Sequence, residues 1–262
     1  MRLMLLSLLL LCCATARGAE VALEDLTTTQ VREALNAGRT LAIVPVGGTE
    51  QNGPHMVLGK HNQRARELAA RIARQLGNAL VAPVVSYAPE GQISPPTEHM
   101  RHAGTISIPE AAFKSVLAAT GRSLKQHGFT DIVYLGDSGN YQHLLRDVAA
   151  GLNKEWAGRG ARAHFIHDYY QAGQAPFSAA LRAKGLSDAQ IGSHAGAADT
   201  ALLMALHPGG VHAAAMPRDT HAGTSQGVRG DPRAASLELG QLGVELIVTR
   251  SVAAIRQATA RP

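Results

Sequence analysis

The chain has almost no cysteine, and the two cysteines that it has stand side by side near its start. Cys12 and Cys13 are the only ones among 262 residues, and they fall inside an N-terminal segment that we expect to be removed. The mature chain would therefore carry no disulfide bond. A chain of this length can bury a core large enough to be stable without crosslinks, so the scarcity of cysteine excludes a small disulfide-rich fold.

Long apolar runs are also missing, apart from one at the N-terminus. The stretch from Leu3 to Cys13 is apolar but too short to span a bilayer. Arg2 precedes it, and residues 14–16 (ATA) follow it as a small-residue cleavage site. This order is typical of a signal peptide, here residues 1–19, and predicts a periplasmic or secreted protein with no stable membrane anchor after cleavage. The alternative is an uncleaved anchor, which N-terminal sequencing of the exported protein would reveal.

Charge of one sign is not concentrated anywhere in the sequence. Lys and Arg number 25 and Asp and Glu number 20, for a formal net charge of +5. The basic residues are scattered and form no block of five or more, so we interpret them as solvated and expect no nucleic-acid partner. No internal repeat or low-complexity tract is visible. We expect the partner of this chain to be a small-molecule substrate.

Apolar runs of strand length alternate with segments of helical period along the mature chain. The pattern predicts strands at 41–46, 79–87, 105–108, 131–135 and 162–166, and helices at 28–37, 64–76, 110–127, 141–156, 197–206 and 234–258. This alternation is typical of an α/β fold with a mostly parallel sheet. No linker divides residues 20–262, so we expect a single domain.

Polar side chains capable of chemistry come directly after two of the predicted strands. Glu50, Asn52 and His61 follow the strand at 41–46, and Asp137 follows the strand at 131–135. The carboxyl ends of parallel strands meet in one crevice, where open α/β sheets place their sites. Carboxylates and imidazoles in such a crevice are typical of a metal centre, although a polar connecting loop with chance histidines would show the same residues.

Five stretches of this sequence, in order, resemble the motifs of the creatininase (creatinine amidohydrolase) family. They are residues 47–61 (GGTEQNGPHMVLGKH), 98–108 (EHMRHAGTISI), 136–140 (GDSGN), 194–200 (HAGAADT) and 227–232 (GVRGDP). They are distributed over roughly residues 40–240, which is nearly all of the mature chain. The resemblance implies a three-layer α/β/α sandwich with a mostly parallel central sheet, a binuclear metal site that hydrolyses amide bonds, and a homo-oligomer, often a hexamer.

The departures from the family's motifs fall on the metal ligands that the resemblance implies. Only Glu50 is unchanged, because the family's aspartate is His61 here and one family histidine is Asp137. The other histidine is Asn52, and a further ligand position holds Gly139. Glu50, His61 and Asp137 still offer two carboxylates and one imidazole, so we predict that they bind one divalent metal per chain, Zn²⁺ or Fe²⁺ in preference to Mn²⁺. The alternative is decay of the site.

The resemblance also implies roles for residues outside the metal set. His194 occupies the position of the family's catalytic histidine, which would move a proton to the leaving amine. Five further residues are expected to contact the substrate or to orient a ligand: Asn52, Glu98, His99, Ser138 and Asp199.

We therefore expect a metal-dependent hydrolase of an amide or cyclic-amide C–N bond. Two alternatives stay open, a catalytically inactive binding protein on the same scaffold and a structural subunit of a larger assembly. Creatinine is not favoured as substrate, because that specificity relies on tryptophans near the catalytic histidine, whereas Trp156 precedes His194 on a separate predicted helix. Asp137 is expected to lie in a surface crevice, so Asp137→Ala should abolish metal binding without unfolding the protein.

Overall fold

The computed structural model describes residues 20–218 and 226–261. The predicted signal peptide, residues 1–19, lies outside the described residues, so its cleavage stays a prediction. Within the described ranges, no helix is long and apolar enough to cross a membrane.

A sheet of four parallel strands forms the centre of the molecule. The strands are β1 (Leu41–Val46), β2 (Ala79–Val81), β3 (Asp131–Gly136) and β4 (Arg162–Phe165), in the spatial order β2-β1-β3-β4. All six residues of β1 pair with β3, from Leu41 opposite Asp131 to Val46 opposite Gly136. Every residue of β1 is buried, which is why this strand is a continuous apolar run without alternation.

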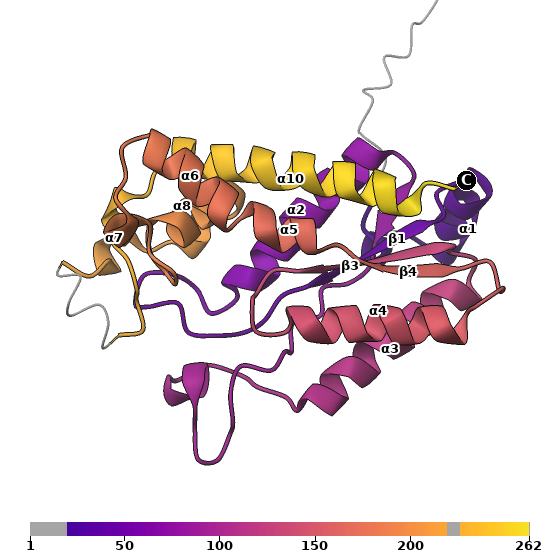
Figure 1. Ribbon diagram of the computed structural model, residues 1–262, viewed down its shortest axis with the longest axis horizontal. Coiled ribbons are helices and arrows are strands. Elements are labelled where there is room, and N and C mark those ends of the chain that lie inside the picture. The colour runs from indigo at the N-terminus through magenta and orange to yellow at the C-terminus, as the bar shows by residue number, and fades with distance from the viewer. Residues whose placement is uncertain (1–19, 219–225, 262) are drawn as a thin grey trace, which may run out of the picture.

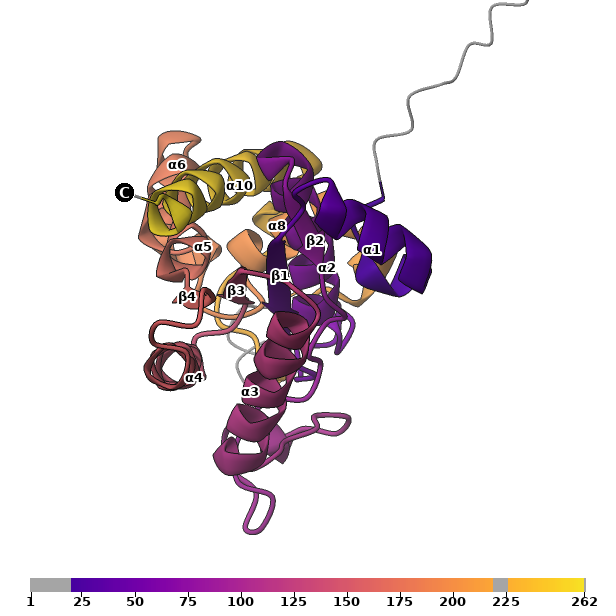
Figure 2. The same ribbon diagram turned by 90° about the vertical axis from the view of Figure 1, so that its right-hand side faces the viewer.

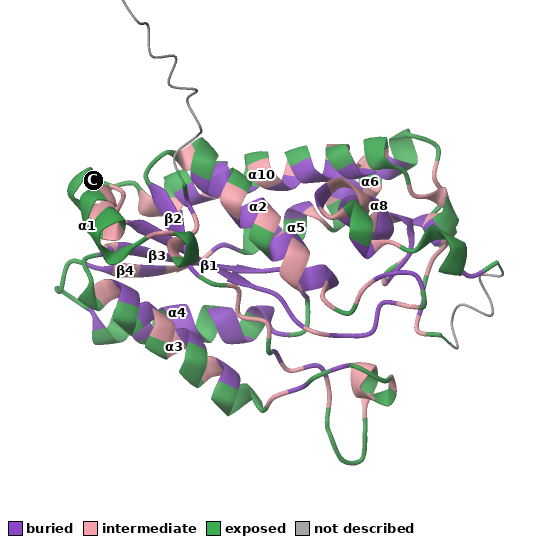
Figure 3. Ribbon diagram, turned by 180° about the vertical axis from the view of Figure 1, so that it is seen from behind, coloured by how far each residue is buried: buried purple, intermediate pink, exposed green. Residues whose placement is uncertain are grey.

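Helices cover both faces of this sheet (Figures 1 and 3). On one face lie α2 (Lys60–Leu76), α5 (His167–Ala172), α6 (Ala175–Ala183), α8 (Ala197–Leu206) and α10 (Leu237–Thr259), and on the other lie α3 (Glu110–Gln126) and α4 (Gln142–Glu155). Ile43 packs in one buried cluster with Ile72 and Ile255, and its neighbour Val44 packs in a second cluster with Phe113. The predicted three-layer α/β/α sandwich is therefore confirmed.

Smaller elements complete the fold. Helix α1 (Thr28–Asn36) lies beside the β2 edge (Figure 2), and α7 (Asp188–Ile191) lies between α6 and α8 in the chain. Short 3-10 helices occur at Leu23–Asp25, Glu98–Arg101, Pro208–Gly210, Ala213–Ala215 and Pro232–Ala234.

One of the predicted strands is shorter than expected, and another does not form a strand. The segment 79–87 pairs as a strand only over Ala79–Val81 and returns to the sheet at one bridge, Val46 to Val85. Pro83 interrupts it, since proline has no N–H to donate to a ladder. The segment 105–108 forms only isolated bridges, from Ile106 and Ser107.

Helix α2 carries the residues that shape the site. Its buried face is made by Ala65, Leu68 and Ile72 at helical spacing. It ends at Gly77, whose φ of 84° is left-handed and whose N–H bonds to the carbonyl of Ala73. The apolar face fixes α2 against the sheet, so the first turn of the helix is held at the carboxyl ends of the strands.

Gly240 in α10 allows this helix to pack closely against α8, and this contact provides a test of the fold. A Cβ on Gly240 would collide with the carbonyl oxygen of Ala201 in α8. Gly240→Ala should therefore lower the free energy of unfolding by about 1–3 kcal/mol through overpacking. Gly151 in α4 has nothing within 4 Å of such a Cβ, so Gly151→Ala should raise stability by roughly 0.5–1 kcal/mol. Urea unfolding measures both, and equal effects would contradict the α8–α10 contact.

Candidate functional site

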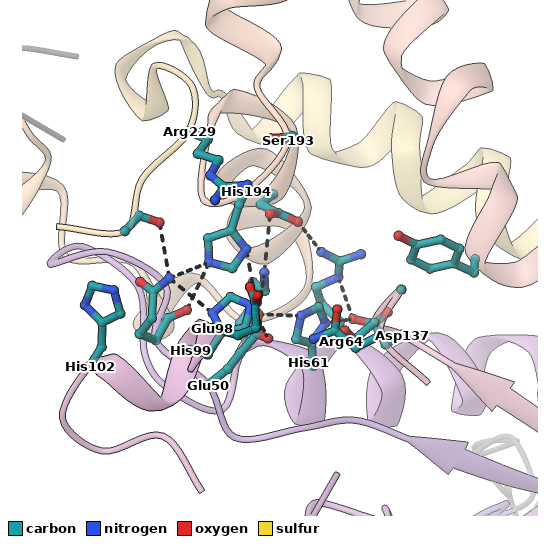
Figure 4. Close-up of a pocket in the computed structure, with 18 of the residues that line it drawn as sticks. Glu50, His61, Arg64, Glu98, His99, His102, Asp137, Ser193, His194 and Arg229 are labelled. Carbon is teal, nitrogen blue, oxygen red and sulfur yellow. Dashed lines mark hydrogen bonds and ion pairs between the residues drawn. The ribbon is translucent and has the colours of Figure 1, made fainter. Parts of the chain in front are cut away.

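A cavity of about 410 Å³ opens beyond the carboxyl ends of β1 and β3. Its lining is almost entirely polar (Figure 4). Eight of the residues singled out from the sequence line it: Glu50, His61, Glu98, His99, Asp137, Ser138, His194 and Asp199. Asn52 does not, because it is fully buried and its amide donates to the carbonyl oxygens of Glu50 (2.9 Å) and Val57 (3.2 Å).

His61 lies between two carboxylates. Its Nε2 is 2.9 Å from Oε1 of Glu50, and its Nδ1 is 2.6 Å from Oδ2 of Asp137. Burial and the ammonium of Lys60 lower the pKa of His61, but the two carboxylates outweigh them and the net pKa is raised. A protonated imidazole donates through both of its nitrogens. His61 therefore joins Glu50 to Asp137 as a cation.

Asp137 is buried, and both of its oxygens have partners. Only 2% of the residue is exposed. Its Oδ1 accepts a hydrogen bond from the hydroxyl of Tyr169 (2.8 Å), and its Oδ2 faces His61 and the Nε of Arg64 (3.1 Å). The expectation that this carboxylate lies at the surface of the crevice is therefore wrong, whereas the effect of its removal stays a prediction. The carboxylate holds three side chains in place.

Two cations at the start of α2 are buried as well. Lys60 and Arg64 are one helical turn apart, on the same face, and are 1% and 5% exposed. The Nζ of Lys60 is 3.3 Å from Asp199 and 3.6 Å from Glu50, and a guanidinium nitrogen of Arg64 is 2.7 Å from Asp199. Burial raises the pKa of Asp199, but the two cations outweigh it and hold that pKa well below its usual range. The interpretation of the basic residues as solvated is wrong for this pair.

Two further imidazoles also face Glu50. The Nε2 of His99 is 3.3 Å from Oε2 of Glu50, and the Nδ1 of His194 is 3.8 Å from Oε1. Burial lowers the pKa of both histidines, that of His194 to about 4, so both rings are neutral at pH 7. The Nε2 of His194 lies 3.0 Å from the carbonyl oxygen of Gln51 and 3.2 Å from the side-chain amide nitrogen of the same residue. In the tautomer that donates to the carbonyl, the lone pair of the ring is on Nδ1. One ligand atom from each of Glu50, His99 and His194 lies within 4.8 Å of the others.

The backbone is strained beside each of these two histidines. Glu98, which precedes His99, has a φ of 45°, and Ala195, which follows His194, has a φ of 53°. In the described part of the chain these are the only residues other than glycine with a positive φ. Such a conformation costs on the order of 1–3 kcal/mol and is concentrated at functional sites. The strain therefore supports a functional role for His99 and His194.

Two sets of side chains are candidates to hold a divalent metal. In the predicted set of Glu50, His61 and Asp137, the second carboxylate is already engaged by Arg64, Tyr169 and His61. The second set of Glu50, His99 and His194 combines one carboxylate with two neutral imidazoles. That combination suits Zn²⁺ or Fe²⁺, so the residues of this structure fit a metal through the second set. The predicted set stays a prediction.

From the sequence, His99 was expected to contact the substrate or to orient a ligand, and His194 was expected to transfer a proton. Positions 50, 99 and 194 are far apart along the chain, so no fixed spacing connects them as ligands. A signal for His99 was its place within a long irregular stretch, residues 88–103, since a loop of that length in a compact domain is usually functional.

Comparison with known proteins gives one family. A model of the family described as creatininase, creatinine amidohydrolase, matches residues 24–255. The mycofactocin precursor peptide peptidase of Mycolicibacterium smegmatis is 30% identical over 222 residues, which cover 77% of this chain and 78% of that protein. A mycofactocin precursor peptide peptidase of Mycobacterium tuberculosis is 32% identical over 127 residues, or 44% of this chain and 48% of that protein.

Solved creatininases share the fold. A crystal structure of creatinine amidohydrolase matches with a TM-score of 0.76 at 22% identity, over 93% of this chain and 99% of that one. A mutant creatininase complexed with creatine matches with a TM-score of 0.75 at 21% identity, over 93% and 100% of the two chains. A manganese form of creatininase matches with a TM-score of 0.74 at 22% identity, over 93% and 100%. At these identities the likeness shows the fold alone.

The burial of Asp137 leads to a test of the ion network. Asp137→Ala should lower the free energy of unfolding by about 3–5 kcal/mol, because it leaves the buried guanidinium of Arg64 without this carboxylate. The matched control is Asp188→Ala, which removes an exposed partner of Arg182 and should cost under about 1 kcal/mol. Chemical unfolding at pH 7 measures both, and a loss at Asp137 no larger than at Asp188 would contradict the network.

Proposed function

Because the chain belongs to the creatininase family, whose members are metal-dependent amidohydrolases, we propose that it hydrolyses an amide C–N bond with one divalent metal held by Glu50, His99 and His194. The observation that carries the proposal is the meeting of one buried carboxylate and two neutral imidazoles in a polar cavity. A bound metal of this kind polarises a substrate carbonyl and lowers the pKa of a water molecule.

The surrounding side chains have roles that follow from their contacts. The chain from Asp137 through His61 to Glu50 orients the carboxylate, as outer partners of a metal ligand do. Lys60 lines the cavity beside Glu50 and keeps a positive charge where negative charge develops on a carbonyl oxygen. Glu98 lines the same cavity and has no ion pair within the described ranges, so its carboxylate is the candidate to take up a proton.

The proposed substrate class is a polar amide, either a small molecule or part of a peptide. The cavity lies at the small end of the range for ligand pockets, roughly 300–1,000 Å³. The curated relatives are named for a peptide precursor. A peptide amide is therefore as well supported as a substrate as a small cyclic amide. Trp156 is buried at the end of α4 and does not line the cavity, so the structure offers no tryptophan there for a ring such as creatinine.

A second candidate function is a binding protein that needs no metal. The observation that favours it is the balance of buried charge at the site. Three cations face three carboxylates in one network: Lys60, His61 and Arg64 against Glu50, Asp137 and Asp199. This network is neutral without any ion from solution, so metal content separates the two candidates.

Metal analysis of purified protein tests the proposal. Protein prepared without a chelating tag should contain one equivalent of divalent metal per chain by mass spectrometry. His99→Ala and His194→Ala should each weaken metal binding by at least about 100-fold, because each removes one of three ligands. His102→Ala is the matched control, since His102 lines the cavity but forms no hydrogen bond or ion pair with Glu50 among the described residues, and it should leave metal content unchanged.

Two results would contradict the proposal in different ways. Full metal content in the double variant of His99 and His194 would place the metal elsewhere, with Glu50, His61 and Asp137 as the first alternative. Absence of metal after incubation with Zn²⁺, Fe²⁺ and Mn²⁺ would favour the binding protein.

A further inference from the structure

Two arginines at the cavity have no acidic partner among the described residues. Arg101 and Arg229 line the cavity and are exposed. Other arginines of the chain form ion pairs, for example Arg122 with Glu155. Guanidinium groups that line a ligand cavity without a carboxylate partner are available to a ligand.

The backbone fixes Arg229 next to His194. The N–H of Arg229 donates to the carbonyl of His194 (2.8 Å), and the carbonyl of Arg229 accepts from the N–H groups of Ser193 (2.9 Å) and His194 (3.3 Å). The carbonyl of Gly227 accepts from the amide of Gln51 (3.2 Å), which ties this segment to the loop after β1. Figure 4 shows the guanidinium of Arg229 directed toward His194. Its side chain therefore starts from a rigid position beside the proposed metal.

The charged residues that line the cavity favour the binding of an anion beside Arg229. The carboxylates of Glu50, Asp137 and Asp199 already have partners within the network, namely Lys60, His61 and Arg64. Glu98 is the remaining carboxylate of the cavity lining, which also contains Arg101 and Arg229. The two arginines Arg101 and Arg229 thus outnumber the one carboxylate of the lining that has no partner in the network.

We propose that Arg229, assisted by Arg101, forms a carboxylate subsite, and that the substrate is an amide that carries a carboxylate group near the bond to be cleaved. Arginine binds a carboxylate through two parallel N–H donors, which gives both charge recognition and a fixed orientation. A carboxylate held beside His194 would place the amide over Glu50, His99 and His194. The cleavage of the amide in this inference rests on the proposed function. The recognition of the carboxylate does not, and it can be tested by binding alone.

The test compares two probes that differ only in this group. N-acetylglycylglycine has a free carboxylate, and N-acetylglycylglycinamide replaces it by a neutral carboxamide. In calorimetry at pH 7.5, the wild-type protein should bind the acid at least about tenfold more tightly than the amide. Arg229→Ala should remove this preference, and Arg229→Lys should keep part of it, since lysine retains the charge but not the fork.

The matched control is Arg146→Ala, which makes the same change of net charge at an exposed position on α4. It should leave the preference for the acid unchanged. The backbone bonds of Arg229 are made by main-chain atoms, so Arg229→Ala should keep the wild-type thermal unfolding midpoint. Equal binding of the two probes by the wild type, a preference that survives Arg229→Ala, or no binding of the acid at millimolar concentration would each overturn the subsite.

Hydrolysis of both probes, measured in parallel, separates this inference from the proposed function. Cleavage of acid and amide at equal rates would support the hydrolase and overturn the subsite. An Arg229-dependent preference in binding, with no cleavage by the metal-loaded protein, would support the subsite and overturn the hydrolase.

Discussion

The ion pairs between the start of α2 and three carboxylates, two of them fully buried, hold the site together. Lys60 and Arg64 extend from one face of the helix to Asp199, and Arg64 also reaches Asp137. Charges removed from water to this degree are tolerated only when they are paired. Because the carboxylates come from the loop after β1, the loop after β3 and the first turn of α8, the pairing fixes the relative position of these three segments. The N–H of Ala195 donates to Asp199, which extends the network to His194.

This network gives His61 and Asp137, the two positions where the sequence departs from the resembled motifs by an exchange, a role other than metal binding. With a histidine at 61 and an aspartate at 137, the two side chains bond directly to each other at 2.6 Å. An imidazole whose two nitrogens both face carboxylates is stabilised as a cation. The exchange therefore produces a support for Glu50, and the neutral histidines at 99 and 194 are left as the nitrogen donors of the cavity.

Much of the fold follows from the sequence because periodicity and turn residues report it directly. The run at 41–46 is buried on both faces, and the two glycine-containing loops after β1 and β3 meet at one cavity, as parallel strands require. The site residues that lie in the sequence motifs could be predicted, and eight of them line the cavity. Burial of Lys60 and Arg64 could not be predicted, because charges near a helix start are usually solvated. The approach of His99 to Glu50 depends on the path of a long loop, which no local pattern encodes.

X-ray absorption spectroscopy of the metal-loaded protein tests the central claim most directly, because imidazole ligands give distinct multiple-scattering signals. A metal held by Glu50, His99 and His194 has two imidazoles and one protein carboxylate in its coordination sphere. The account predicts this ratio, together with the loss of one imidazole in His99→Ala. A sphere with one imidazole and two carboxylates, unaltered by His99→Ala, would contradict it and assign the metal to Glu50, His61 and Asp137.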